Sequence, residues 1–279
     1  MKYYLFFLKY YLNLLGLIMP KIAGKKAFNV FQTVRLKTVK KREAPFYEIA
    51  KPFTLKLDND ELHCYEMGNP DGDLVILVHG WNSNAGSLLL FAKALAAKGF
   101  RVISFDHLAH HKSTKKYTNL YETKKAFGKL LAYLNPQKPF SLIGHSFGAS
   151  AIAYTLKNTN YEVNKIVLLS SNDMIINVFY DFQKAIGFNN RVFNNAKLYI
   201  DKLIHDDFAK MSTATNYQLV NYKKLLIIHD KKDKVIPYTD AINIQQKTLN
   251  STLISFERIG HYRMLWNTEV LNETVKFLS

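Results

Sequence analysis

Cysteine is nearly absent from this chain, because Cys64 is the only one among 279 residues. A single thiol excludes an intrachain disulfide framework and a zinc site built on cysteines. It mildly favours a reducing compartment, but a single buried thiol without a chemical role explains it better. Internal repeats and low-complexity tracts are lacking as well. Hydrophobic residues make up 48% of the chain, which is enough for the core of one large α/β domain or two small domains.

Acidic residues are also scarce, with 22 Asp and Glu against 38 Lys and Arg, so the net charge is +16. The excess is greatest in residues 1–51, which hold 11 Lys or Arg and 2 Glu. A basic total is typical of nucleic-acid-binding proteins. Here, however, the basic block adjoins an apolar, aromatic segment, which indicates an anionic membrane surface instead. We therefore expect no nucleic-acid partner.

An unbroken apolar run of the length that spans a membrane is missing too. The opening segment MKYYLFFLKYYLNLLGLIMP is interrupted by Lys9 and Asn13, and no A-x-A cleavage site follows it. On a helical projection its polar and small residues share one stripe, made of Lys2, Lys9, Asn13, Gly16 and Pro20. Three alternatives stay open: a helix in the membrane interface, which fits best, a single spanning anchor, and a helix that covers an apolar patch of the domain.

Residues 1–52 are therefore predicted to form an amphipathic helix and a basic connector, with residues 1–42 facing an anionic membrane surface. The expected location is the cytoplasm, with the protein peripheral on the inner membrane or anchored to it. Downstream, short apolar runs alternate with segments of helical spacing. This alternation predicts an α/β fold over residues 53–279, a mostly parallel central sheet with helices on both faces. Residues 172–215 are too long for an ordinary crossover and are predicted to form a helical lid insertion.

The stretch SLIGHSFGASAIAY places Ser146 in a turn between an apolar run and a predicted helix. Its pentapeptide matches G-x-S-x-G, in which Gly144 and Gly148 allow a sharp strand-to-helix turn that exposes the serine hydroxyl. The match is weak by itself, and a tight turn with an incidental serine is the alternative. The flanking strand and helix favour a nucleophile.

A serine nucleophile requires a histidine base and an acid that orients the histidine. Asp233 lies in the loop HDKKDKVIP after a predicted strand, and His261 follows the last predicted strand. Active sites of open α/β sheets gather at the carboxyl ends of the strands, so Ser146, Asp233 and His261 are predicted to meet there. Asp230 in the same loop and Asp173 after the preceding strand are competing acids.

The predicted sheet region resembles the α/β-hydrolase family, through the segments LVHGWNSNAGS, FDHLAHHKST, GHSFG, HDKKDKVIP and IGHYRMLWN. The resemblance implies Ser146 as the nucleophile, His261 as general base and acid, and Asp233 as the orienting carboxylate. It also implies an oxyanion hole formed by the backbone N–H groups of Trp81 and Phe147, which would stabilise the charge developing in the transition state.

Several other motif residues are expected to have supporting roles. His79, Gly80 and His145 lie within the motifs, and the two histidines are expected to hydrogen-bond locally and hold the loops. Asp230 stands where the family often has glycine, and His111 stands where it usually has glycine in FDHLAHHKST. His111 is one of three clustered histidines, with His107 and His110. These histidines resemble a metal site, but Asp106 is their only evident carboxylate neighbour. We expect no metal ion and no cofactor.

The resulting hypothesis is acyl transfer to water through an acyl-enzyme, which makes the protein a serine hydrolase of a small-molecule carboxylic ester, thioester or amide. Aromatic residues of the insertion either line an apolar acyl site or pack the lid; they are Phe179, Tyr180, Phe182, Phe188 and Phe193. A membrane-bound N-terminus would favour a hydrophobic ester. The alternative function is a non-catalytic, membrane-tethered binding module, because fold alone does not establish activity.

Overall fold

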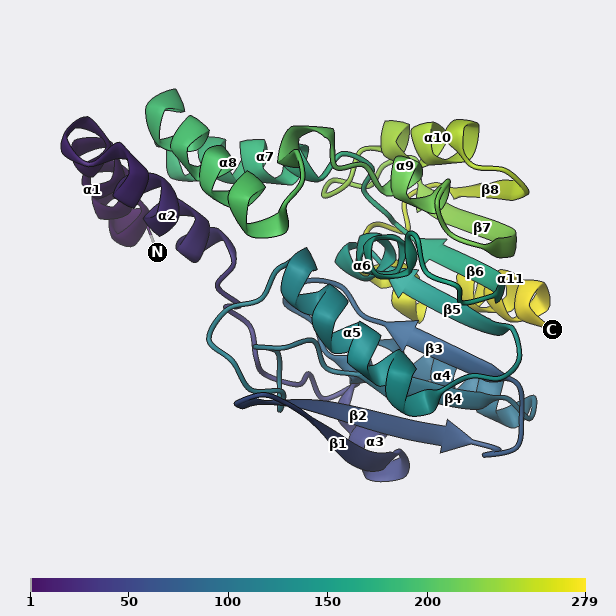
Figure 1. Cartoon of the computed structure of the whole chain (residues 1–279). Helices are drawn as coiled ribbons and strands as arrows, with labels where there is room; N and C mark the ends of the chain where they lie inside the picture. Colours follow the sequence, from purple (N-terminus) through teal and green to yellow (C-terminus); the bar gives the residue numbers. More distant parts are fainter. Residues whose placement is uncertain (1) are drawn as a thin grey trace. The chain divides into compact units, whose positions relative to one another are not determined.

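The computed structural model describes residues 2–279, and the chain divides into two compact units (Figure 1). The larger unit contains Val34–Asp173 and Thr213–Ser279. The smaller unit combines the segment that ends at Thr33 with Met174–Ser212. The N-terminal helices and the helical insertion, which the sequence pattern suggested as separate pieces, are thus grouped in one compact unit.

The larger unit is built on an eight-stranded sheet with the order β1-β2-β4-β3-β5-β6-β7-β8. The first two strands form an antiparallel hairpin, and β2 also pairs antiparallel with β4. All pairs from β4 through β8 are parallel. The strands are β1 (Lys51–Leu57), β2 (Asp60–Gly68), β3 (Leu74–Val78), β4 (Arg101–Phe105), β5 (Phe140–His145), β6 (Val163–Leu169), β7 (Tyr222–Asp230) and β8 (Ser251–Phe256).

The central strands are apolar at consecutive positions because helices cover both faces of the sheet. In β3, Val75 and Leu77 belong to the core on one face of the sheet. The alternate residues, Ile76 and Val78, are equally buried. Along one face run α5 (Leu120–Leu134), α6 (Phe147–Leu156), α9 (Thr213–Tyr217) and α10 (Tyr238–Lys247), and α4 (Leu89–Ala97) packs with α11 (Thr268–Leu278) on the other (Figure 1). The short helix α3 (Ala44–Ile49) precedes β1. The predicted mostly parallel α/β sheet is confirmed.

The smaller unit is entirely helical in its regular structure, within the described residues. It contains α1 (Lys2–Ile18), α2 (Pro20–Phe31), α7 (Ile175–Ile186) and α8 (Asn190–Ile204). Its core includes three insertion phenylalanines, Phe179, Phe188 and Phe193, packed with Leu12 and Phe28 of the N-terminal helices. Phe182 packs partly buried against the same core. These aromatic side chains pack within the smaller unit, against the N-terminal helices.

The polar stripe of α1 faces α8 and the turn before it. The Asn13 side chain donates to the Gly187 carbonyl at 3.3 Å and accepts from the Asn189 N–H at 2.8 Å. A Cβ on Gly16 would lie 2.6 Å from Val192 of α8, so only glycine permits this approach. The stripe is used for helix packing, because small and polar residues allow close contact and hydrogen bonds between helices.

The opposite face of α1 is apolar and exposed. Large side chains that are at least half exposed there are Tyr3, Tyr4, Phe6, Phe7, Tyr10, Tyr11, Leu14, Leu17 and Ile18. We call these nine residues the outer face of α1. Over residues 2–279, no helix has both the length and the apolar character needed to cross a membrane.

Candidate active site

Ser146 occupies the turn between β5 and α6, as its motif predicts. Its backbone angles are φ 51° and ψ −119°. Residues other than glycine rarely adopt this conformation, which costs about 1–3 kcal/mol. The turn is held by the Ser146 N–H, which donates to the Leu169 carbonyl of β6 at 2.9 Å. Ser146 is partly exposed at the carboxyl end of the sheet, where an open α/β fold places its chemistry.

The glycines of the motif are required by close backbone contacts. A Cβ on Gly148 would lie 2.1 Å from the Val78 carbonyl oxygen, at the end of β3. A Cβ on Gly144 would lie 2.7 Å from Cα of Ala149. The first contact brings the start of α6 against the loop that follows β3, which contains Trp81.

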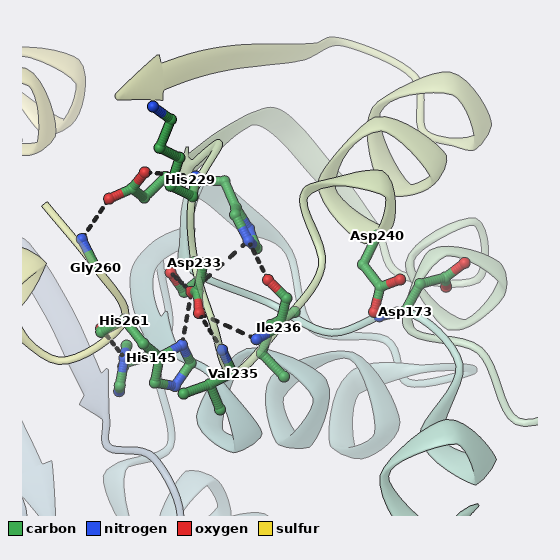
Figure 2. A network of polar contacts seen from close by, with 12 residues as sticks. His145, Asp173, His229, Asp233, Val235, Ile236, Asp240, Gly260 and His261 are labelled. Atoms are coloured by element: carbon green, nitrogen blue, oxygen red, sulfur yellow. Dashed lines mark hydrogen bonds and ion pairs between the residues drawn. The ribbon is translucent and has the colours of Figure 1, made fainter. Parts of the chain in front are cut away.

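His261 and Asp233 meet in a direct hydrogen bond, although 28 positions separate them in the chain (Figure 2). The His261 Nδ1 lies 2.8 Å from the Asp233 Oδ2, and both side chains are buried. Because a carboxylate only accepts, Nδ1 carries the proton and Nε2 keeps its lone pair. Protonation at Nδ1 leaves the other ring nitrogen able to act as a base.

The charge of Asp233 is stabilised by several donors. Its Oδ1 accepts from the N–H groups of Val235 at 2.7 Å and Ile236 at 3.1 Å. Burial alone would raise the pKa of Asp233, but the hydrogen bond and charge of His261 and these two amides outweigh it and lower the pKa to about 2. Asp233 is therefore ionised at neutral pH.

The two competing acids have other partners. Asp230 accepts from the N–H groups of Lys232 at 2.8 Å and Arg258 at 3.2 Å, and also from that of Gly260. It fastens the loop that leads to His261. Asp173 lies away from this group, where its N–H donates to Asp240 at 3.0 Å and its Oδ1 accepts from Ala214 at 3.1 Å (Figure 2).

The sequence arguments missed two residues that contact Asp233. The Ser170 hydroxyl donates to Asp233 Oδ2 at 2.9 Å, and the His229 Nε2 lies 3.8 Å from the same oxygen. The His229 ring donates to the Ile236 carbonyl at 3.1 Å, and burial lowers the pKa of this histidine. Ser170 follows β6 outside the quoted segments, and His229 opens HDKKDKVIP at the end of β7, so only these positions at the strand ends signalled the two residues.

Ser146 and His261 are brought into the same neighbourhood through His145. The His145 ring lies 4.8 Å from the His261 ring, and its Nε2 donates to the His261 carbonyl at 3.1 Å. Burial, followed by the neighbouring His261, lowers the pKa of His145 to about 3. Among residues 2–279, no protein group is hydrogen-bonded to the Ser146 hydroxyl, so the expected bond to His261 is not formed. In free enzymes such bonds are often completed only when substrate binds.

The two residues expected to supply the oxyanion hole also lie together. The Trp81 and Phe147 rings are 5.2 Å apart. Phe147 is the first residue of α6, so its N–H has no partner within the helix. The histidines near this loop do not gather with acids into a metal site: over residues 2–279, no group of three or more His, Cys, Asp or Glu could hold a metal ion.

Comparison with known proteins shows which proteins this chain is similar to. Residues 73–193 match the family model described as the alpha/beta hydrolase fold. A serine hydrolase-like protein of Dictyostelium discoideum is 31% identical over 142 residues, which cover 46% of this chain and 40% of that protein. A non-heme chloroperoxidase of Streptomyces lividans is 25% identical over 269 residues, covering 77% of this chain and 94% of that protein. An esterase structure from Pyrococcus furiosus has a TM-score of 0.67 at 17% identity, and the match covers 88% of this chain and 97% of that chain.

Residues 73–193 of this chain match the α/β-hydrolase family model, and the whole sheet region has the α/β-hydrolase fold. The sheet, the serine turn and the order of the motif residues all agree with that assignment. The names of the similar proteins describe different reactions, so the comparisons establish the hydrolase fold and leave the substrate to be argued from the site.

Proposed function

We propose that the larger unit hydrolyses a carboxylic ester, with Ser146 as nucleophile, His261 as general base and acid, and Asp233 as the orienting carboxylate. The observation that carries the proposal is the 2.8 Å hydrogen bond between Asp233 and His261. The strained turn that holds Ser146 supports it, because the preceding residue, His145, contacts the His261 ring. A serine hydroxyl is a poor nucleophile at neutral pH unless a base removes its proton.

The proposed reaction proceeds through two acyl transfers. His261 Nε2 takes the Ser146 proton while the serine oxygen attacks the ester carbonyl, and the protonated ring then gives that proton to the leaving alcohol. Water next attacks the acyl-enzyme with His261 as base again. Asp233 stays ionised and stabilises the imidazolium. The N–H groups of Trp81 and Phe147 would bind the oxyanion in both halves, and loss of one such donor typically costs about 3–4 kcal/mol.

The surroundings favour a hydrophobic ester over a charged one. The two proposed oxyanion-hole residues, Trp81 and Phe147, have partly exposed aromatic side chains, and Val235 and Tyr262 follow Asp233 and His261 closely in the sequence. Val235 is 47% exposed and Tyr262 is 54% exposed. Thioesters and amides fit the same groups.

Hydrolysis of p-nitrophenyl esters of increasing acyl length tests this proposal. We expect turnover that rises beyond acetate and that falls by at least about 10³-fold in Ser146→Ala. Ser141→Ala, a buried serine in β5, is the matched control and should keep its activity. Turnover that survives in Ser146→Ala would remove Ser146 from the mechanism. Saturable ester binding without turnover would instead support the non-catalytic binding module.

We also propose that the outer face of α1 docks on an anionic bilayer. Ten Lys or Arg and no Asp or Glu occur in residues 1–42. Tyrosine, phenylalanine and leucine on one face of a helix, with lysines close by, are typical of helices that lie in the membrane interface. Each basic residue near such a surface contributes about 1 kcal/mol. A second copy of this chain is the rival occupant, but two such basic segments would repel each other.

Flotation with phosphatidylcholine vesicles, with and without phosphatidylglycerol, tests the docking. Binding should require phosphatidylglycerol and weaken with salt. Replacing two outer-face residues in Phe7→Ser/Leu14→Ser should weaken binding by about 100-fold or more, since each large apolar side chain contributes about 1.5–3 kcal/mol when buried. Tyr133→Ser, an exposed aromatic in α5, is the control. Dimerisation that the double variant abolishes, without vesicle binding, would assign this face to self-association.

A further inference from the structure

The loop after β3 is fixed on both sides of Trp81 by buried imidazoles. The His79 carbonyl accepts from His107 Nε2 at 2.8 Å, and the Gly80 carbonyl accepts from His79 Nδ1 at 2.7 Å. Beyond Trp81, the Asn82 N–H donates to His110 Nε2 at 3.1 Å. Among residues 2–279, no protein group accepts from the Trp81 N–H itself. Three ring nitrogens therefore restrain the loop and leave the backbone N–H of Trp81 available to a ligand.

The same imidazoles connect this loop to the start of α6. The His107 ring lies 4.3 Å from His79, 5.7 Å from His110 and 5.2 Å from Phe147. Trp81 contacts both His110 at 5.3 Å and Phe147 at 5.2 Å. The ring cluster thus spans the two residues whose N–H groups would form the oxyanion hole. All three histidines are fully buried, so solvent does not compete for their hydrogen bonds.

The hydrogen-bond directions require neutral rings. His110 Nε2 accepts from the backbone N–H of Asn82, and His79 Nε2 accepts from the backbone N–H of His107 at 3.0 Å. Burial lowers the pKa of His107 to about 3 and that of His110 to about 4, and it lowers the pKa of His79 as well. The acceptors are therefore unprotonated over the whole neutral range. This explains a histidine cluster that resembled a metal site in the sequence.

We infer that His107 and His110 are positioning residues, which hold the Trp81 N–H in the geometry that receives the oxyanion. This inference rests on the proposed ester hydrolysis. Neither residue touches the reacting atoms; they act through the backbone of the loop. A donor that is displaced by about 1 Å loses much of its effect on the transition state, with losses of about 100-fold, while ground-state binding of the ester changes little.

The experiment compares phenylalanine and glutamine at each position in the full chain. His107→Phe and His110→Phe keep a planar ring but remove the polar nitrogen, whereas His107→Gln and His110→Gln keep a polar atom that can bond the backbone. We expect kcat for p-nitrophenyl butyrate to fall by about 10- to 100-fold in the phenylalanine variants, with KM within about twofold of the parent value. The glutamine variants should recover most of the loss.

The affinity of a trifluoromethyl ketone inhibitor distinguishes a positioning role from a purely structural one. The inhibitor mimics the oxyanion, so its affinity should fall in proportion to kcat/KM across the four variants. His63→Phe in β2, whose ring lies beside Glu61, is the matched control and should change neither quantity. If a phenylalanine variant fails to fold, His107→Ala or His110→Ala, which leaves room for water, takes its place.

The outcomes separate this inference from the proposed function. Unchanged kcat and inhibitor affinity in folded phenylalanine or alanine variants would overturn the positioning role while leaving Ser146 catalysis intact. A loss that glutamine does not recover, and that follows the melting temperature of the variants, would also overturn it. Absence of Ser146-dependent hydrolysis in the parent protein would overturn both the proposed function and this inference.

Discussion

Two aspartates three positions apart offer the sharpest test of the site, because only Asp233 touches His261. Its pKa is lowered from the ordinary value of 3.8 to about 2. That difference corresponds to about 2 kcal/mol, reduced to roughly 1 kcal/mol by solvent screening. Asp233→Asn removes the charge that stabilises the imidazolium and allows the wrong ring tautomer. We expect kcat to fall by about 10³- to 10⁴-fold with little change in KM.

Asp230→Asn is the matched substitution. Asp230 accepts backbone N–H groups from Lys232, Arg258 and Gly260, so an asparagine there should loosen the loop and lower the free energy of unfolding by about 1–3 kcal/mol. Its kcat should fall by no more than about 10-fold. Steady-state kinetics with p-nitrophenyl esters and urea unfolding measure both variants. A larger loss of kcat in Asp230→Asn than in Asp233→Asn would refute the assignment.

The pH dependence of unfolding checks the same carboxylate. A group whose pKa is lowered in the folded state contributes stability above its unfolded pKa and loses that contribution as the pH falls through the folded value. The stability difference between the parent and Asp233→Asn should therefore be constant above about pH 4 and should shrink between about pH 4 and pH 2. A difference that instead grows as the pH falls through that interval would contradict the lowered pKa.

The remaining predictions concern packing. Gly148→Ala would place a Cβ 2.1 Å from the Val78 carbonyl oxygen, so it should lower the melting temperature and reduce activity. Gly128→Ala in α5 has no atom within 4 Å of the new Cβ and should stabilise the protein by about 0.5–1 kcal/mol. Equal melting temperatures for these two variants would contradict the steric argument. Phe179→Ala should destabilise the smaller unit by about 3–5 kcal/mol, measured by amide exchange in α7 and α8. Unchanged exchange there would show that this core does not hold the unit together.

The sheet could be predicted from sequence because its physical cause is local. A strand covered on both faces must be apolar at consecutive positions, as in residues 74–78, and glycine or a polar turn ends it. The serine turn is likewise encoded within five residues. The choice between Asp230 and Asp233 was harder, because both lie in one loop and the deciding contact comes from His261, on a different loop.

The N-terminal helix shows where sequence periodicity is insufficient. Periodicity identified the stripe containing Asn13 and Gly16, but it could not say which face of the helix meets the protein. Both faces of α1 carry large apolar residues, and the stripe's partners, Gly187 and Val192, lie more than 170 positions away. Only tertiary contacts decide that the stripe is packed and that the outer face is exposed.

Covalent labelling tests directly whether Ser146 is the nucleophile. The full chain is treated with a fluorophosphonate, digested and mapped by mass spectrometry. We expect one modified peptide, with the phosphonyl group on Ser146. Labelling should be largely lost in Ser146→Ala and His261→Ala and, to a smaller extent, in Asp233→Asn. Labelling on a different serine, or an unmodified Ser146 in a chain that hydrolyses esters, would contradict it.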